Sequence, residues 1–260
     1  MGFYRGPKVV TDGLVFCLDY ANSKSYTSGS HNNVVSDILG SVNDLSINSY
    51  SSANADSFDT QYKGVTRTST SVNTSTSKLN IDNSNAITFI ASGSDASTEF
   101  TLECIFKPSG FSTDTYFGLE NVLIAKGQFS TLNYLMQINS SQLSFCKRSP
   151  NEGLLFTDFS TTFTTGKIYH AVLTVTDSQS LQGNVRGYSN GVYLGETNLT
   201  GDPIQPDDDG DDPFYCPAGG GTNYYMNFQG TYYTCRIYNK RLSTEEVQQN
   251  YNALKSRFGL

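Results

Sequence analysis

The stretch YNKRLSTEEVQQNYNALKSRFGL, residues 238–260, is the only part of this 260-residue chain that reads as a long helix. Ser243 is a suitable N-cap because its hydroxyl can accept a hydrogen bond from the amide of Glu246, whose side chain can reach back to the amide of Ser243. Gly259 follows the last turn, where a residue in the left-handed conformation commonly ends a helix. We therefore predict a capped C-terminal α-helix over residues 243–258.

One narrow face of this helix is apolar. Its apolar residues recur at spacings of i, i+4, i+7 and i+11, and they are Val247, Tyr251, Leu254 and Phe258. Leu242, just before the N-cap, stands where a hydrophobic staple would contact Val247. A stripe of this width indicates a helix that covers the core of its own domain.

The rest of the chain carries strand and turn signals. FTLECIF, residues 100–106, alternates between an apolar face and a face with Thr101, Glu103 and Ile105, which predicts a strand. Its core face would carry Phe100, Leu102, Cys104 and Phe106. IYHAVLTV, residues 168–175, is apolar on both faces, as expected of a strand between two layers. YSNGVYLG, residues 188–195, holds Asn190-Gly191 between two strand-like arms, the strongest short signal for a β-hairpin.

Composition favours one large all-β domain. Only 16% of the residues are charged and 13% are aromatic, while Ser, Thr, Asn and Gly abound, which is typical of a strand-rich and loop-rich domain. No linker and no fixed-period repeat divides the chain, and all-β sandwiches often reach this length as one unit. We therefore predict an antiparallel two-sheet sandwich over residues 13–260, preceded by an extended N-terminal arm over residues 1–12.

Charge and targeting signals argue against two classes of partner. The net charge of −7 and the absence of a basic run argue against a nucleic-acid partner. The N-terminus lacks the apolar core of a signal peptide, and no run is long enough to span a bilayer. We therefore expect synthesis in the cytoplasm and no membrane partner.

The cysteines and histidines show no pattern of a disulfide scaffold or a metal site. Five cysteines are an odd number at scattered positions, and four of them lie in strand-like runs, which predicts buried free thiols at Cys17, Cys104, Cys146 and Cys235. His31 and His170 have no Cys or carboxylate at metal-ligand spacing. We expect His170 to be structural.

Six fragments occur in an order that resembles a known family. They are DGLVFCLDYANSKSY, FTLECIFKPSG, NVLIAKG, GKIYHAVLTV, YSNGVYLGE and GTYYTCRIYNKRLSTEEV, spread across residues 13–247. Together they resemble the laminin-G-like branch of the concanavalin A-like lectin/glucanase superfamily. This resemblance implies a jelly roll of two antiparallel sheets with a short helix after the last strand. Ile105 and Ile168 stand where the family commonly has Trp, and the chain contains no Trp, which weakens the expectation of sugar stacking.

The two ends of the chain carry a narrower resemblance. YRGPKVVTDGLVFCLDYANSKSY near the start and NYNALKSRFGL at the end resemble stand-alone laminin-G-like structural proteins of tailed bacteriophages, especially marine ones. This resemblance implies a non-enzymatic structural or decoration protein of the virion, a homo-oligomer in contact with other virion proteins. The alternative is a carbohydrate-binding adhesin that recognises host or environmental glycans, and the third reading is a glycoside hydrolase.

A hydrolase would require a pair of carboxylates. Glu99, Thr101 and Glu103 share one strand face and echo the Glu-x-Asp-x-Glu pattern of retaining glucanases. The two Glu Cα atoms would lie about 13 Å apart at roughly 3.3 Å per residue, whereas retaining chemistry needs carboxyl groups about 5–5.5 Å apart. Thr101 also replaces the carboxylate that would tune the pair. We therefore predict no catalytic residues.

The stretch PDDDGDDP, residues 206–213, concentrates five carboxylates that repel one another. It fails as an EF-hand, but Gly210 would allow a sharp turn that converges Asp207, Asp209 and Asp211 on one calcium ion. The other reading is a solvated acidic loop that protects a strand edge. Calcium is the only cofactor that the sequence suggests, and none is required.

Aromatic residues mark two further candidate sites. Tyr215, Tyr224 and Tyr225 follow the acidic loop, and tyrosine suits both sugar binding and subunit interfaces. In the N-terminal arm, Phe3, Tyr4 and Arg5 are of types enriched at interfaces, so we expect the arm to contact a neighbouring subunit.

Overall fold

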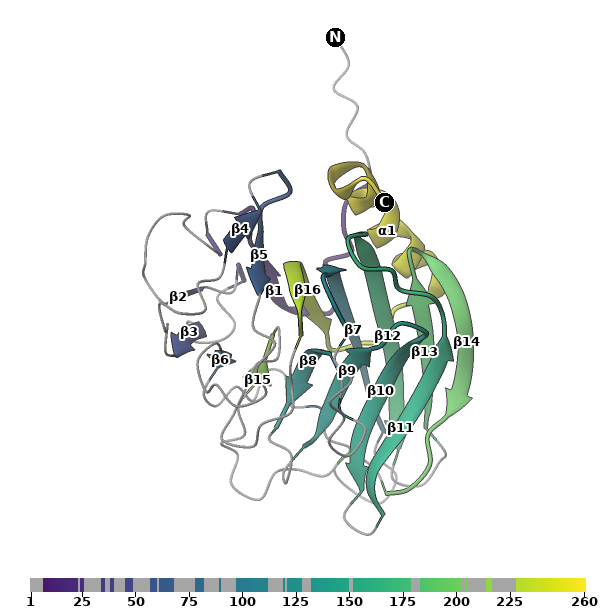
Figure 1. Cartoon of the computed structure of the whole chain (residues 1–260). Coiled ribbons are helices and arrows are strands. Elements are labelled where there is room, and N and C mark those ends of the chain that lie inside the picture. The colour runs from purple at the N-terminus through teal and green to yellow at the C-terminus, as the bar shows by residue number, and fades with distance from the viewer. Residues whose placement is uncertain are drawn as a thin grey trace.

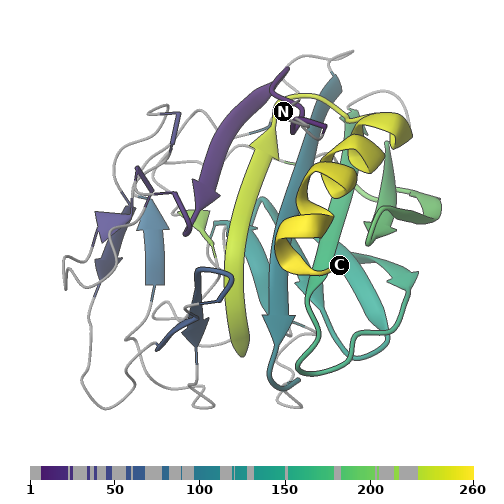
Figure 2. The same ribbon diagram turned by 90° about the horizontal axis from the view of Figure 1, so that it is seen from above.

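Two antiparallel β-sheets stack face to face, and the single helix of the described chain, α1, lies across the outer face of one of them (Figures 1 and 2). This computed structural model describes residues 7–22, 24–25, 34–35, 38–39, 45–48, 57–59, 61–67, 78–81, 89, 97–111, 119, 121–127, 132–149, 152–178, 183–202, 204, 214–216 and 228–260. Within these residues, no helix has the length and apolar character needed to cross a membrane.

The sheet that carries α1, called the helix-bearing sheet below, contains eight of the described strands. Seven of these strands follow one another in a continuous order. The eighth, β1, pairs with β16, which also pairs with β5. In spatial order they are β14 (Val192–Asn198), β13 (Asn184–Ser189), β12 (Tyr169–Ser178), β7 (Ser97–Pro108), β16 (Gly230–Tyr238), β5 (Gly64–Arg67) and β4 (Ser57–Asp59), with β1 (Leu14–Asp19).

The second sheet also contains eight of the described strands. In spatial order they are β11 (Gly153–Ser160), β10 (Gln142–Ser149), β9 (Tyr134–Ile138), β8 (Val122–Lys126), β15 (Phe214–Tyr215), β6 (Lys78–Ile81), β3 (Leu45–Asn48) and β2 (Val34–Val35). All pairings in both sheets are antiparallel. The predicted all-β, two-sheet jelly-roll sandwich with a C-terminal helix is therefore confirmed.

Residue alternation along β7 explains how the two layers form. The main core between the sheets contains the four residues predicted for its inner face, Phe100, Leu102, Cys104 and Phe106, all fully buried. On the opposite face, Ile105 packs in a second cluster with Leu254 and Phe258 of α1. β12 behaves in the same way: Leu173 joins the main core, whereas Val172 packs with Val247 of α1.

The hairpin between β13 and β14 is tied to the helix. Asn190 and Gly191 have φ angles of 50° and 74°, the pair of positive values that a tight two-residue turn requires. A Cβ atom on Gly191 would lie 2.7 Å from the ring of Tyr251. This close approach lets the turn rest against α1 and excludes larger residues from the position.

α1 runs from Thr244 to Phe258 and has the caps that the sequence predicts. Ser243 accepts a hydrogen bond from the Glu246 amide at 3.2 Å, and Glu246 accepts one from the Ser243 amide at 2.9 Å. Gly259 ends the helix in the left-handed conformation. The buried face differs from the predicted stripe at one position. It consists of Val247, Asn250, Leu254 and Phe258, while Tyr251 is only half-buried at its edge.

All five cysteines are free and buried, which confirms the prediction made for Cys17, Cys104, Cys146 and Cys235 and adds Cys216. Burial raises the pKa of the Cys104 and Cys235 thiols well above the usual value. These groups are therefore uncharged core side chains at neutral pH.

The capping box gives a direct test of the helix. We expect Ser243→Ala to lower the free energy of unfolding by about 1 kcal/mol, because the amide of Glu246 loses its acceptor. The matched control is Ser256→Ala, since Ser256 is exposed within the helix and caps nothing. Alanine there should leave stability unchanged or slightly raised. Thermal unfolding measures both, and equal melting temperatures for the two variants would contradict the role of the cap.

Candidate functional site

Most sequence-predicted site residues lie outside the described part of the chain. These are the calcium candidates Asp207, Asp209 and Asp211, the tyrosines Tyr224 and Tyr225, the arm residues Phe3, Tyr4 and Arg5, and His31. The calcium site, the tyrosine site and the subunit-contact arm therefore stay predictions. Tyr215 lies in β15, where it pairs with Asn80 of β6 and Ala125 of β8. In the described residues, no group of three His, Cys, Asp or Glu side chains could hold a metal ion.

The two carboxylates weighed as a catalytic pair have opposite environments. Glu99 is exposed near the start of β7. Glu103, four residues further along, is fully buried between the helix-bearing sheet and α1. A carboxylate enclosed in this way has no contact with solvent.

Glu103 is the centre of a buried polar group, which we call the Glu103 cluster: Glu103, His170, Arg236, Tyr238 and Asn250. Each carboxylate oxygen has two partners. Oε1 lies 2.9 Å from His170 Nε2 and 3.4 Å from Arg236 Nη1. Oε2 lies 3.2 Å from Tyr238 Oη and accepts a hydrogen bond from Asn250 Nδ2 at 2.8 Å.

Strand register places the cluster on one face. Arg236 of β16 stands directly opposite Glu103 of β7, and His170 of β12 stands opposite Ile105, the next residue of β7 on the same face. Asn250 reaches down from α1, on its buried face. The cluster therefore joins three neighbouring strands to the helix.

Charges within the cluster compensate one another. Burial alone would raise the pKa of Glu103, but the hydrogen bond from His170 and the positive charge of Arg236 hold it below the usual value. Burial alone would lower the pKa of Arg236, but the charge of Glu103 raises it. Burial and the same carboxylate raise the pKa of Tyr238. Glu103 and Arg236 are thus a charged pair, and Tyr238 is a neutral donor at ordinary pH.

Asn250 connects the cluster to the start of the chain. Its Oδ1 accepts a hydrogen bond from the amide of Val10 at 2.7 Å, and Tyr238 Oη lies 3.3 Å from the carbonyl oxygen of Val10. The side chain of Val10 is buried among residues of β12, β16 and α1. The backbone before β1 is therefore held by the same residues that hold the helix.

From the sequence, we considered Glu103 and His170 individually and did not consider Arg236 or Asn250. Asn250 could have been recognised as a buried polar residue, because it occupies a helix position where the periodicity predicts an apolar side chain. Asn250 lies between Val247 and Leu254 at helical spacing, which places it on the buried face.

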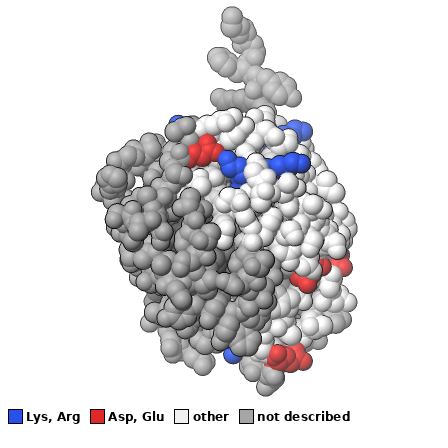
Figure 3. Space-filling model, viewed as in Figure 1, with Lys and Arg blue, Asp and Glu red and all other residues white. Residues whose placement is uncertain are grey.

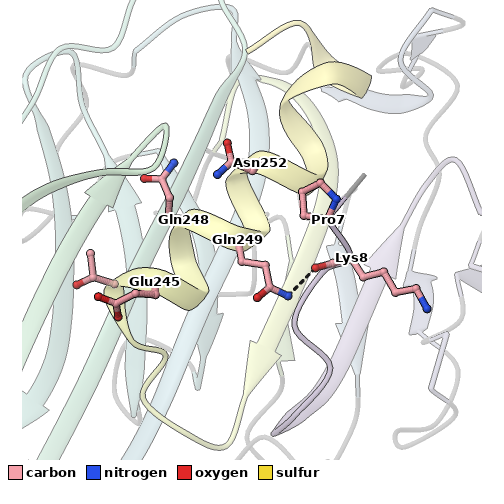
Figure 4. A pocket seen from close by; sticks show the side chains of 7 residues that line it. Pro7, Lys8, Glu245, Gln248, Gln249 and Asn252 are labelled. Atoms are coloured by element: carbon pink, nitrogen blue, oxygen red, sulfur yellow. Dashed lines mark hydrogen bonds between the residues drawn. The ribbon is translucent and has the colours of Figure 1, made fainter. Parts of the chain in front are cut away.

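The opposite, solvent-facing side of α1 borders a shallow groove with a volume of about 630 Å³. Its lining comes from α1 and the segment before β1, namely Pro7, Lys8, Thr244, Glu245, Gln248, Gln249 and Asn252 (Figure 4). Gln249 Nε2 donates a hydrogen bond to the carbonyl oxygen of Lys8 at 2.8 Å, which fixes this amide at the groove wall. In the view of Figure 3, most of the described surface belongs to uncharged residues.

The Glu103 cluster predicts a large effect of one isosteric substitution. Glu103→Gln should lower the free energy of unfolding by about 3–5 kcal/mol, because it removes the buried negative charge that compensates Arg236. The same change at the exposed Glu99 should fall within about 0.5 kcal/mol of zero. Urea unfolding of the two variants checks this, and equal midpoints would contradict a stabilising role of the buried ion pair.

The lowered carboxyl pKa values predict loss of stability in acid. Besides Glu103, the pKa values of Asp19, Asp59 and Glu196 lie below their usual values. Because the folded-state pKa is the lower one, these groups stabilise the fold above about pH 5, and the unfolded state binds more protons as pH falls. Urea unfolding from pH 7 to pH 3 should show stability falling below about pH 5. The fall should be shallower in Glu103→Gln, and a stability that rises in acid would contradict the assignment.

Comparisons with known proteins support this architecture. Domain 4 of AbnA, an extracellular arabinanase from Geobacillus stearothermophilus solved with arabinotriose, has a TM-score of 0.56 and 14% identity over 92% of this chain and 98% of its own. The botulinum neurotoxin serotype G binding domain has a TM-score of 0.57 and 14% identity over 92% of this chain and 50% of its own. Trypanosoma rangeli sialidase, solved with sialic acid, has a TM-score of 0.57 and 17% identity over 98% of this chain and 36% of its own.

At these identities the structural likeness shows the fold alone, and this chain spans about half of the toxin domain and about a third of the sialidase. No curated protein sequence matches the chain. A family model, Laminin_G_3, matches residues 81–248, which is more than half of the chain. The protein therefore belongs to the concanavalin A-like lectin/glucanases superfamily, as a laminin-G-like domain with a lectin-like fold.

Proposed function

We propose that this chain is a non-enzymatic carbohydrate-binding domain that serves as a structural or decoration protein of a phage particle. The observation that carries the non-enzymatic part is the burial of Glu103. The one carboxylate pair that echoes a glucanase pattern has one member enclosed beneath α1 and bonded through both oxygens. Acid–base chemistry needs a group within hydrogen-bond reach of the substrate, and Glu103 has no such access.

Carbohydrate binding is supported by membership of a lectin-like superfamily. Among similar structures, the arabinanase domain was solved with arabinotriose. Two others are the binding domains of paraclostridial mosquitocidal protein 1 and of botulinum neurotoxin serotype G. A lectin-like domain without a hydrolytic centre would act by holding a glycan rather than cleaving it.

The role in the virion is the more specific part of the proposal. The two sequence segments that resemble phage structural proteins, near the start and at the end of the chain, contact each other in the structure. The backbone amide of Val10 donates a hydrogen bond to Asn250 of α1, and the carbonyl oxygen of Lys8 accepts one from Gln249 of α1. We propose that the chain contacts other virion proteins or a second copy of itself, with neither nucleic acid nor a membrane as partner.

The catalytic question has a direct test. Incubation of the full chain with β-glucans, marine polysaccharides and bacterial cell wall should release no reducing ends above background, while immobilised glycans should retain the protein saturably. Glu99→Gln serves as the control because Glu99 is the exposed carboxylate of the pair. Turnover by the wild type that this variant abolishes would overturn the non-enzymatic assignment.

The virion role is tested separately on purified particles. Stable co-purification of the chain with particles, at a fixed copy number, supports it. Complete removal of the chain by gentle washing, with intact particles left behind, would reject the structural role and leave carbohydrate binding unaffected.

A further inference from the structure

We propose that the exposed face of α1 and the exposed ring of Tyr193 form one binding surface for a neutral oligosaccharide. This inference rests on the proposed carbohydrate-binding function and assigns it a place. The surface consists of the groove along α1 and the adjoining tip of the β13–β14 hairpin.

Three of the seven residues that line the groove are amides. Gln248 and Gln249 are neighbours on one turn of α1 and Asn252 lies on the next turn, and each amide can both donate and accept a hydrogen bond. A sugar hydroxyl also donates and accepts, so a row of amides complements a row of hydroxyls. The bond from Gln249 Nε2 to Lys8 leaves the carbonyl oxygen of Gln249 directed away from Lys8 as a fixed acceptor (Figure 4).

Tyr193 supplies an aromatic surface beside the groove. Its side chain is 47% exposed, and the neighbouring Val192 is 62% exposed, the two largest exposures among the described large apolar residues. Exposed tyrosine combines an apolar face with a polar hydroxyl, the combination that a sugar ring requires.

Contacts beneath the surface position Tyr193 next to the helix. Tyr193 stands opposite Tyr188 in the β13–β14 pairing, and their ring centroids are 5.5 Å apart. Tyr188 is buried, and its Oη lies 3.2 Å from Oγ1 of Thr244, which lines the groove. Gln248 lies near the hairpin turn, because its Nε2 would be 3.1 Å from a Cβ atom on Gly191. The aromatic ring and the amides therefore belong to one continuous face.

Charge selects the ligand class. The groove contains one cation, Lys8, and one anion, Glu245, and its other side chains are uncharged. The chain as a whole carries a net charge of −7, which repels anionic glycans. A neutral oligosaccharide meets no such repulsion.

The experiment measures binding of the full chain to arabinotriose and cellotetraose as neutral probes, and to sialyllactose as an anionic probe, by titration calorimetry. We expect a neutral probe to bind, and Tyr193→Ala to weaken it about tenfold through loss of ring contact. Gln248→Ala should weaken it severalfold, since one hydrogen bond is lost. Gln61→Ala removes an exposed amide in the β4–β5 turn and should change nothing.

The outcomes separate this inference from the function on which it rests. Neutral binding that both groove variants retain at full strength would overturn the site and leave the carbohydrate-binding function standing. Binding of sialyllactose alone would overturn the ligand class. Binding of none of the three probes would overturn this inference, whereas retention on immobilised glycans tests the proposed function separately. Melting temperatures equal to that of the wild type verify that Tyr193→Ala and Gln248→Ala remain folded, since both side chains lie at the surface.

Discussion

The enclosure of the Glu103 carboxylate between a sheet and a helix is the constraint on which the rest of this structure depends. Removing a charge from water is costly, and an ion pair offsets that cost only when further hydrogen bonds satisfy the remaining lone pairs. Glu103 meets this condition with two partners on each oxygen, drawn from β12, β16 and α1. The partners are therefore not interchangeable, because displacement of any one exposes part of a buried charge. A purely apolar contact would allow α1 to shift along the sheet, whereas the hydrogen bonds of the Glu103 cluster fix the helix in one position.

Further ion pairs hold the two ends of the helix. Near its C-terminus, Arg257 makes a bidentate contact with Asp19 of β1, at 2.6 and 2.7 Å. Near its N-terminus, Lys240 lies 2.8 Å from Glu246 and 2.6 Å from Asp12. The Glu246 pair is partly exposed and the Asp12 contact is largely exposed, so they add less stability than the buried centre. Their effect is to orient α1 along the sheet while Glu103 fixes its position.

Much of the fold could be predicted from the sequence because its signals are local. Alternation along residues 100–106, the Asn190-Gly191 turn and the Ser243–Glu246 capping box each involve residues close together in the chain, and each lies in the structure as predicted. The Glu103 cluster could not be derived in this way. Arg236 becomes the partner of Glu103 through strand register across more than a hundred residues, and no local period encodes that register.

The candidate sites show the same division between local and non-local information. The acidic stretch 206–213 and the tyrosines after it are conspicuous in composition, yet composition alone does not say which side chains converge. The groove on α1, in contrast, is not conspicuous in the sequence. Its amides would be taken for an ordinary solvated helix face, and they become a candidate site only because the β13–β14 hairpin places Tyr193 near them.

The position of α1 links the buried cluster to the surface chemistry. The helix packs on the outer face of β7, β12 and β16 and buries the residues of these strands beneath it. The same helix then presents its own polar side to solvent. Because Asn250 holds its inner side and Gln249 holds the segment before β1, the outer side chains rest on a rigid base. A rigid base limits the conformational entropy that the protein side chains lose when a ligand binds. The buried cluster around Glu103 therefore also orders the helix surface that we propose as the glycan site.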